Sequence, residues 1–559
     1  MNKKSQAFWI VCAVLFSLNI GFYAGQKMRQ RQPQLKLLRS EQNKINETLE
    51  LVNLHYVDSV DLKFLSESAV GKIISELDPH SSYIPASDVE TVNEDLESSF
   101  SGIGIQFNNI TDTIIVTSIF SGGPAEKAGL RPFDRILTVN DSVVAGKNYG
   151  SNKLVRMLRG PKNSKVMLGI QRGKADQLLS FELVRGDIPN KSIDVSYKVS
   201  ANVGYIKVSK FARSTYSELL TAIAKLRQEG VSGLVIDLRE NPGGYMEAAY
   251  LMVNEFLSKG SMMVYTQGKA YPRTDFRATG KGTCKDVPLV VLIDELSGSA
   301  SEIFAGAIQD NDRGLIIGRR SYGKGLVQTK LDLSDRSALL LTIQRYYTPS
   351  GRCIQKDYQL GKSQEYSMEI LNRLRHGEHF TADSIKLNES LVYHTIGGRT
   401  VYGGGGIMPD IFVPYDTTGN TSYLSQLYET GILYQFTIEY SDRNQDKLKS
   451  FNDDKALHEY LKQQPLISEL AEYASSKGVR KRPTLMDISQ KLIETELYAY
   501  IVRNFFSEGY YKVKMQDDHS LKKAIEVIEK GVWKPVEGGE KSEGGFEVEV
   551  IETDAWKPV

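Results

Sequence analysis

Between residues 204 and 346, short apolar segments alternate with segments of helical periodicity. The apolar segments are rich in aliphatic and β-branched residues, as expected for strands that are buried on both faces. Such alternation is typical of an α/β layer architecture. We predict strands at residues 205–208, 234–238, 289–293, 315–317 and 338–346, and helices at 246–257, at 301–309 and between the capping box Thr215-x-x-Glu218 and Gly230.

Three loops at the ends of predicted strands carry residues that are suited to catalytic chemistry. Asn241-Pro242-Gly243-Gly244 can turn sharply and present bare N–H groups. Ser299 lies between a strand and a helix, where the first helical N–H groups are unpaired and suit an oxyanion. Lys324 lies between Gly323 and Gly325, so its amine can be buried; burial lowers the pKa of an amine and lets it act as a base.

Each loop also has an ordinary structural interpretation: a turn, a helix N-cap and a surface lysine, respectively. Together, a Ser, a Lys and a Gly-Gly turn at neighbouring strand ends are the parts of a Ser–Lys hydrolase. No histidine lies in or next to these loops, so a Ser-His-Asp triad has no obvious base. Ser321-x-x-Lys324 also matches the S-x-x-K of β-lactamases. That motif opens a helix, whereas here a strand is expected to follow, which makes a penicillin-interactive hydrolase the weaker alternative.

The N-terminus predicts a membrane anchor. Lys3 and Lys4 precede an apolar run at residues 7–24, which as a helix would span about 27 Å. No A-x-A cleavage site follows it, which favours a retained signal anchor. We therefore expect a single-pass anchor, with residues 1–6 in the cytoplasm and the remaining chain outside it. Basic residues also follow the run, so the charges alone leave the orientation open.

Composition excludes several classes of protein. Hydrophobic residues make up 41% of the 559 residues, which excludes a disordered chain. A net charge of +1 offers no electrostatic footprint for nucleic acid, so no nucleic-acid partner is expected. No His or Cys cluster has the spacing of a metal site, so we expect no metal and no cofactor. Cys12 lies in the predicted anchor, and whether Cys284 and Cys353 pair stays open.

Several motifs together resemble the carboxyl-terminal processing proteases, a Ser–Lys peptidase family (S41) with an embedded PDZ domain. The resemblance covers roughly residues 40–415 and lies outside the three loops as well as in them. Gly298 and Asp294 depart from the family pattern, but neither replaces a reacting side chain. The motifs are Leu77-Asp78-Pro79-His80-Ser81-Ser82-Tyr83, Gly102-Ile103-Gly104-Ile105, Gly123-Pro124-Ala125 through Leu130, Asp134-Arg135-Ile136-Leu137, Asp237 through Gly244, Ser299-Ala300-Ser301-Glu302, Gly323-Lys324-Gly325 through Gln328 and Tyr347 through Gly351.

The resemblance implies a role for each matching residue. Ser299 would be the nucleophile, Lys324 the base and Gln328 its assistant, with the oxyanion held by the N–H groups of Gly244 and Ala300. A substrate tail would add as a β-strand to the PDZ domain. The tail-binding loop would be Gly102, Ile103, Gly104 and Ile105.

The resemblance also implies the fold and the partners. We expect a crotonase-like α/β protease core with an inserted PDZ domain, an N-terminal helical segment and a C-terminal helical region. The protein would cleave extracytoplasmic proteins near their C-termini; the alternative is a non-catalytic, membrane-anchored PDZ scaffold. An adaptor protein and a homo-oligomer both stay open. The expected divisions are the anchor at 7–24, a helical region at 25–98, the PDZ domain at 99–187, the protease core at 188–416, a helical region at 417–535 and a flexible tail at 536–559.

Overall fold

The structure is a computed structural model that describes residues 44–94, 96–109, 112–173 and 177–532. The predicted anchor at 7–24 and the tail expected at 536–559 lie outside the described residues. Within the described ranges, none of the helices combines the length and the apolar character needed to cross a membrane.

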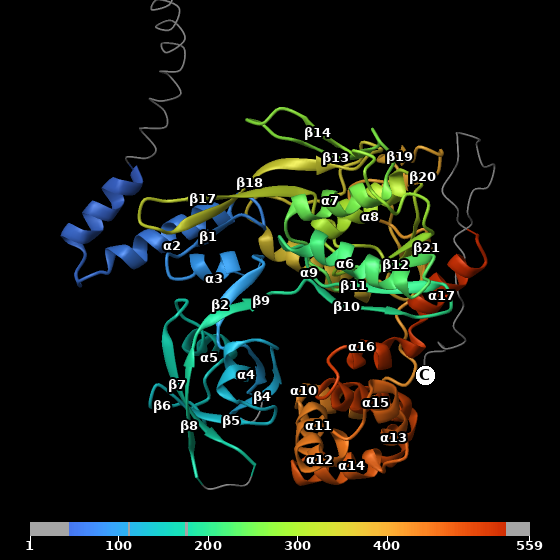
Figure 1. The fold of residues 1–559 in the computed structure, drawn as a ribbon. Helices are drawn as coiled ribbons and strands as arrows, with labels where there is room; N and C mark the ends of the chain where they lie inside the picture. The colour runs from blue at the N-terminus through green and yellow to red at the C-terminus, as the bar shows by residue number, and fades with distance from the viewer. Residues whose placement is uncertain (1–43, 95, 110–111, 174–176, 533–559) are drawn as a thin grey trace, which may run out of the picture.

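A six-stranded sheet forms the centre of the molecule (Figure 1). β10 pairs with β11 in antiparallel fashion, and the remaining neighbours are parallel. The α/β architecture predicted from the alternating segments is therefore confirmed, and the predicted strand at 289–293 is β15. The strands, in spatial order, are β10 (Ile193–Lys198), β11 (Val203–Val208), β12 (Gly233–Asp237), β15 (Leu289–Ile293), β16 (Leu315–Gly318) and β21 (Ile411–Phe412).

Both faces of this sheet are covered. On one face, apolar side chains of the strands pack against α6 (Thr215–Gln228), α7 (Met246–Phe256) and α8 (Ala300–Asp310). On the other face, Val235, Leu292 and their neighbours pack against α17 (His519–Glu529). Alternate residues of each strand face opposite layers, which explains why the inner strands β12, β15 and β16 are almost entirely apolar. The protease-like core is thus completed by a helix from the far end of the chain.

A second sheet lies beside the central one. β18 (Ala338–Tyr347) pairs along one edge with β17 (Leu326–Asp332). Its other edge pairs with β1 (Ser82–Ile84) and, further along, with β13 (Met262–Gln267), which pairs with β14 (Thr274–Arg277). The helical region expected at residues 25–98 therefore also contributes a strand, β1, to this sheet. The described helices there are 44–55, α2 (Leu62–Ser75) and α3 (Val89–Glu94).

Residues 99–189 form a separate unit with its own apolar core. A two-stranded antiparallel ribbon, β2 (Ser99–Gly102) with β9 (Gly186–Pro189), connects this unit to the rest of the chain. Its sheet has the order β3–β4–β5–β7–β8, with β6 on β5. The elements are β3 (Ile105–Asn108), β4 (Ile114–Ile119), α4 (Pro124–Ala128), β5 (Arg135–Val139), β6 (Ser142–Val143), α5 (Ser151–Leu158), β7 (Lys165–Gln171) and β8 (Leu179–Val184).

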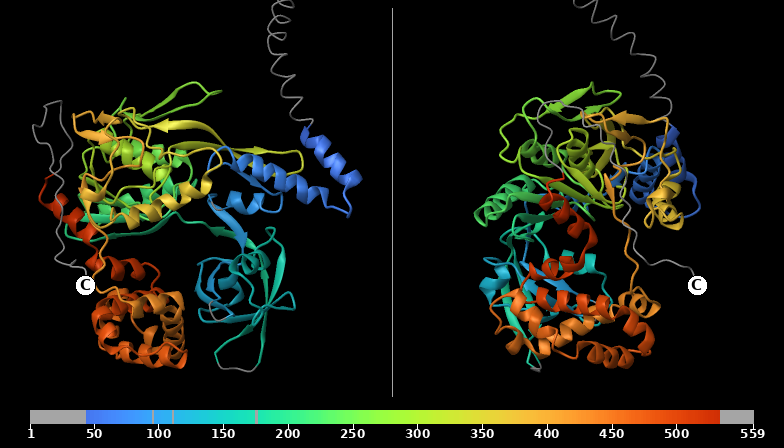
Figure 2. Two further views of the ribbon diagram at one scale, coloured as in Figure 1. Left: turned by 180° about the vertical axis from the view of Figure 1, so that it is seen from behind. Right: turned by 90° about the vertical axis from the view of Figure 1, so that its right-hand side faces the viewer.

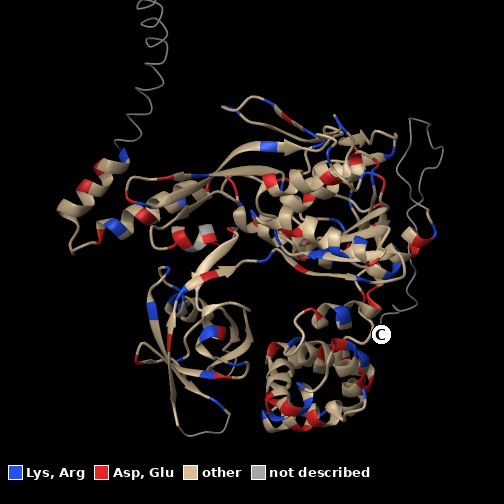
Figure 3. Cartoon of the chain, viewed as in Figure 1, with Lys and Arg blue, Asp and Glu red and all other residues tan. Residues whose placement is uncertain are grey.

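A helical region follows the core and faces the unit formed by residues 99–189 (Figures 1 and 2). Its helices share one apolar cluster. Acidic and basic residues are interspersed along the elements in view (Figure 3). The helices are α10 (Ser422–Glu429), α11 (Ile432–Arg443), α12 (Gln445–Leu448), α13 (Asp454–Leu461), α14 (Leu466–Ser476), α15 (Pro483–Arg503) and α16 (Gly509–Lys514), and the segment between core and helical region holds α9 (Ser363–Arg375), β19 (Val392–His394) and β20 (Thr400–Tyr402).

The predicted capping box at Thr215 and Glu218 is wrong in its bonding. The N-cap residue of α6 is Ser214, and the Glu218 carboxylate accepts hydrogen bonds from the backbone N–H groups of Ser192 and Ile193, both at 2.9 Å. A tertiary contact therefore replaces the hydrogen bond that the local pattern predicted between the Glu218 carboxylate and the helix start.

The packing of α17 predicts that Leu521→Ala destabilises the protease core. Leu521 is buried against the central sheet, so its truncation leaves a cavity that costs about 2–5 kcal/mol. We expect a lower thermal midpoint for the core transition, measured by circular dichroism. The matched control is Ile488→Ala, because Ile488 is 55% exposed on α15. Equal, small shifts in both variants would contradict the assignment of α17 to this core.

Candidate active site

Ser299 lies at the turn between β15 and α8, as the N-cap residue of that helix. Its backbone has φ 54°, a region that residues other than glycine adopt at a cost. Gly243 packs directly against this turn: a Cβ atom added there would lie 2.7 Å from Ser299 Cβ and 2.9 Å from the Ala300 nitrogen. The Gly-Gly turn and the serine turn therefore fit together only because position 243 has no side chain.

A buried carboxylate, Glu302, joins the serine turn to the lysine loop. Its Oε2 accepts from the backbone N–H groups of Ser299 at 2.8 Å and Lys324 at 2.9 Å. Its Oε1 accepts from the Ser321 hydroxyl at 2.5 Å and the Gly323 N–H at 2.6 Å. Burial raises the pKa of Glu302 above its ordinary value, and these four donors partly oppose that shift. Since all four partners donate, the arrangement fits the ionised carboxylate.

The Lys324 amine lies next to Gln328, the third member of the predicted set. Nζ donates to Oε1 of Gln328 at 2.9 Å. Burial lowers the pKa of Lys324, and the negative charges of Asp78 and Glu302 oppose that shift. A lysine with a lowered pKa is neutral in a larger fraction of molecules at physiological pH, and only the neutral amine can accept a proton.

Tyr346, on β18, connects the same two loops through its hydroxyl group. Its hydroxyl lies 2.6 Å from the Lys324 carbonyl oxygen and 3.1 Å from the Ser299 carbonyl oxygen. Burial raises the pKa of this phenol far above its ordinary value, so it stays a hydrogen-bond donor. The sequence reasoning missed both Tyr346 and the joining role of Glu302.

The Gly-Gly turn supplies backbone N–H groups beside the serine. Asn241 is buried and holds this turn: its carbonyl oxygen accepts from the Gly298 N–H at 3.0 Å and from the Ser301 hydroxyl at 2.9 Å. Gly244 is packed so closely that a Cβ atom would lie 2.2 Å from the Phe211 carbonyl oxygen. The N–H groups of Gly244 and Ala300 have no acceptor among the described residues.

Asp294, one of the two departures from the family pattern, binds the same turn. Its Oδ1 accepts from the Glu240 N–H at 2.9 Å and the Leu296 N–H at 3.1 Å. Burial raises the pKa of this carboxyl group. The residue thus connects the segment before the Gly-Gly turn to the segment before Ser299.

A histidine distant in sequence also reaches the site. The His80 carbonyl oxygen accepts from the Gln328 amide, and its ring Nε2 lies 2.8 Å from the Tyr366 hydroxyl. Burial and the nearby Lys324 charge lower the pKa of His80 to about 4, so the ring is neutral near pH 7. Periodicity could not place His80 here; the family-like segment around it was the available signal.

Ser321, the nucleophile of the weaker alternative, is fully buried. Its hydroxyl donates to Glu302 and accepts from the Ile407 N–H at 2.6 Å. Its proton is therefore directed at a carboxylate and away from Lys324 Nζ. Cys284 and Cys353, whose pairing stayed open, are free thiols.

The expected tail-binding loop lies at the end of the ribbon. Gly102 ends β2, Ile103 is buried, and Ile105 starts β3 after Gly104. β3 is the edge strand of its sheet, paired with β4 on one side within the described residues. An open edge of this kind can accept an added strand.

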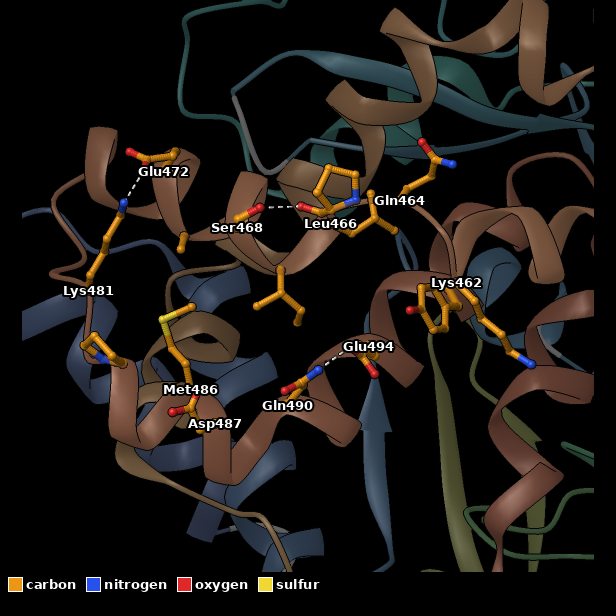
Figure 4. A pocket seen from close by; sticks show the side chains of 15 residues that line it. Lys462, Gln464, Leu466, Ser468, Glu472, Lys481, Met486, Asp487, Gln490 and Glu494 are labelled. Atoms are coloured by element: carbon orange, nitrogen blue, oxygen red, sulfur yellow. Dashed lines mark hydrogen bonds and ion pairs between the residues drawn. The ribbon is translucent and has the colours of Figure 1, made fainter.

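A pocket of about 450 Å³ lies elsewhere, between α14, α15 and the segment that precedes α14 (Figure 4). Lys481 and Glu472 pair on its rim, as do Gln490 and Glu494 at 2.8 Å. The pocket brings together none of the residues predicted for catalysis.

Comparison with known proteins fits this geometry. Residues 202–361 match the model of peptidase family S41, residues 101–183 match a PDZ domain, and residues 423–507 match a family of unknown function (DUF8443). The expected fold class, an α/β protease core with a PDZ domain and a helical C-terminal region, is confirmed.

The relatives name the branch of the family. The carboxy-terminal processing protease CtpB of Bacillus subtilis is 32% identical over 405 residues, 70% of this chain and 82% of that protein. A probable CtpA-like serine protease of Staphylococcus aureus strain N315 is 36% identical over 314 residues, 56% of this chain and 62% of that protein. The solved photosystem II D1 C-terminal processing protease is 29% identical with a TM-score of 0.33, covering 56% of this chain and 90% of that one. The chain belongs to the carboxy-terminal processing proteases of peptidase family S41.

The four bonds of Glu302 predict that Glu302→Gln disrupts the site. Glutamine places an NH₂ group where one carboxylate oxygen accepted from two donors. Two donors then face a third and lose their acceptor. We expect peptidase activity to fall at least about 100-fold, together with a lower thermal midpoint. The matched control is Glu365→Gln, because Glu365 is an exposed residue on α9. Near-full activity in Glu302→Gln would contradict the joining role.

Proposed function

We propose that the protein is a serine endopeptidase of the Ser–Lys type that cleaves extracytoplasmic proteins near their C-termini. The observation that carries the proposal is the joining of two loops by Glu302 and Tyr346, which holds the turn of Ser299 against the loop of Lys324, a lysine of lowered pKa. Membership of the carboxy-terminal processing proteases supports the substrate class. The complete catalytic set disfavours the non-catalytic scaffold.

The proposed mechanism starts with neutral Lys324. Its Nζ takes the hydroxyl proton of Ser299 as Ser299 Oγ attacks the scissile carbonyl carbon. The N–H groups of Gly244 and Ala300 stabilise the resulting oxyanion. Lys324 then gives the proton to the leaving amine, and the acyl-enzyme forms. Water hydrolyses the acyl-enzyme with Lys324 again as base.

Gln328 has a positioning role in this mechanism. It accepts from Lys324 Nζ and donates to the His80 carbonyl oxygen, so the amine and the side chain that holds it are both fixed. With one N–H of the neutral amine donated to Gln328, the lone pair of Nζ can then point toward the Ser299 hydroxyl group and accept its proton.

Substrate selection is proposed for the PDZ domain. A substrate tail would add to β3, with its terminal carboxylate at residues 102–104. We also propose that residues 7–24 anchor the chain in the bacterial inner membrane with the catalytic region in the periplasm; Lys3, Lys4 and the apolar run support this. An adaptor protein and a homo-oligomer remain expectations from the resemblance.

Ser299→Ala and Gln328→Ala should separate the two roles. Ser299→Ala removes the attacking oxygen, so cleavage of an unfolded reporter with a small apolar tail should disappear, as followed by intact mass. Gln328→Ala loosens the amine, so activity should fall by about 10- to 100-fold and persist. Ser297→Ala is unsuitable as a control because Ser297 is buried and hydrogen-bonded; Ser367→Ala, on α9, is the matched one. Wild-type rates in Ser299→Ala would refute the nucleophile.

The lowered pKa of Lys324 predicts the pH dependence. Activity needs the neutral amine, so kcat/KM should rise with pH and level off above the pKa of Lys324, which lies below the ordinary lysine value of about 10.4. Lys324→Arg keeps a positive charge throughout this range and should be inactive at every pH. A profile that falls between pH 6 and 9 would contradict a lysine base.

A further inference from the structure

The PDZ domain touches the helical region through a face of its own. Ile115 on β4 and Phe133 before β5 form a small apolar cluster with Ile438 on α11. Tyr434 and Phe505 pack against the same cluster, and the Phe133 and Phe505 rings lie 6.0 Å apart. Ile115 and Phe133 belong to this cluster and not to the PDZ domain's own apolar core.

Phe133 has an unfavourable backbone conformation at this position. Its φ is 73°, a left-handed conformation that is a genuine outlier for a bulky residue. Its side chain is nevertheless 3% exposed, because residues of the helical region cover it. A residue held against its backbone preference at a contact between two units points to a role for that contact.

An ion pair lies beside the cluster. Arg135 on β5 donates to Asp442 on α11 at 3.1 Å, and both side chains are mostly buried. The pair fixes which faces of the two units meet, because either charge would lack its partner in another orientation.

The helical region is fixed to the protease core at its other end. Asp518 caps α17 by accepting from the Leu521 N–H at 2.7 Å, and its second oxygen accepts from Arg239 at 2.7 Å. Arg239 also binds Asp237, at the end of β12, and begins the segment that leads to the Gly-Gly turn. α17 itself covers one face of the central sheet.

From these two attachments we infer that the helical region, residues 422–529, is a strut that fixes the PDZ domain relative to the catalytic core. The ribbon of β2 and β9 alone joins the PDZ domain to the core by chain connection, and a two-stranded ribbon is a weak constraint on orientation. The strut would keep the tail-binding edge β3 in the position from which a bound tail reaches Ser299. This function rests on the proposed peptidase activity.

Occlusion of the active site is not what this contact does. Within the described residues, no hydrogen bond or ion pair joins residues 99–187 to Ser299, Lys324 or Gln328. Two further ion pairs, Arg159 with Glu94 at 2.8 Å and Arg156 with Asp88 at 3.2 Å, join the PDZ domain to α3 and the residue before it, and the variants below leave both pairs intact. The strut is therefore expected to assist substrates that use the PDZ domain, and to leave short peptides unaffected.

Phe133→Gly tests the strut in the full chain. Glycine relieves the backbone at φ 73° and deletes the ring from the cluster, so the PDZ domain keeps its fold and loses its support. The matched control is Asp141→Gly, an exposed residue of the same domain with φ 60°. Hydrogen exchange of residues 99–102 and 186–189 should accelerate at least about tenfold in Phe133→Gly and stay unchanged in Asp141→Gly.

A charge exchange tests the orientation. Arg135→Glu should accelerate the same amides, because it sets two negative charges together, and adding Asp442→Arg should restore slow exchange. Rescue by the second substitution separates a broken contact from general damage to the fold. Failure of the double variant to recover, with both proteins folded by circular dichroism, would count against the pair as a fixing contact.

Cleavage measurements test the consequence. For the reporter with a free apolar tail, Phe133→Gly should lower kcat/KM at least about tenfold through KM, while an amidated short peptide should be cleaved at the wild-type rate. Unchanged exchange in Phe133→Gly would overturn the strut. Faster cleavage of either substrate would also overturn it, because the contact would then restrain the enzyme. If wild type cleaves nothing, the proposed function fails by itself, and the exchange measurements still decide the strut.

Discussion

The Glu302 carboxylate is the interaction on which the rest of the site depends. It lies in the first turn of α8 and accepts four hydrogen bonds, one from Ser299 in the serine turn and three from the lysine loop, whose donors are Ser321, Gly323 and Lys324. Ser299 belongs to the loop after β15 and Lys324 to the loop after β16, and the shared acceptor Glu302, together with the Tyr346 hydroxyl group, holds the two loops against each other. Burying one carboxylate is costly, but a fully paired one costs far less than four unpaired donors would. The site is thus assembled around a charge that takes no direct part in the proposed chemistry.

The other constraints concern space. Gly243 and Gly244 lie where a Cβ atom would overlap the serine turn or the backbone of Phe211. The tight packing brings a pair of N–H groups next to Ser299 without any side chain intervening. Tyr346 then closes the arrangement by reaching both loops from the second sheet. The second sheet, whose strand β1 comes from the N-terminal segment, therefore contributes to catalysis through position alone.

The sequence predicted the central strands well because apolar runs bounded by glycine and proline leave few alternatives. Motifs that the family resemblance made specific supplied the candidate reacting residues, whose roles stay predictions. Local patterns failed where a distant partner decided the outcome: Glu218 binds Ser192 and Ile193 and leaves the helix start, and β1 forms because β18 offers a partner for it. The contributions of His80 and of Asp518, each more than a hundred residues from its partner in sequence, had no local signature.

The helical region extends this picture from the site to the whole chain. α17 covers one face of the protease sheet, and Asp518 reaches the segment before the Gly-Gly turn. At its far end the same region packs against Ile115 and Phe133 of the PDZ domain. In the arrangement that we propose, this contact connects substrate recognition to catalysis by a path outside the protease fold itself.

The most direct test of the central claim is the labelling of the full chain by a serine-directed fluorophosphonate, with the modified residue located by peptide mass mapping. The account predicts a single label on Ser299, a labelling rate that rises with pH as Lys324 loses its proton, and no label in Lys324→Arg. A label on Ser321, or labelling of Ser299 that proceeds equally well in Lys324→Arg, would contradict it.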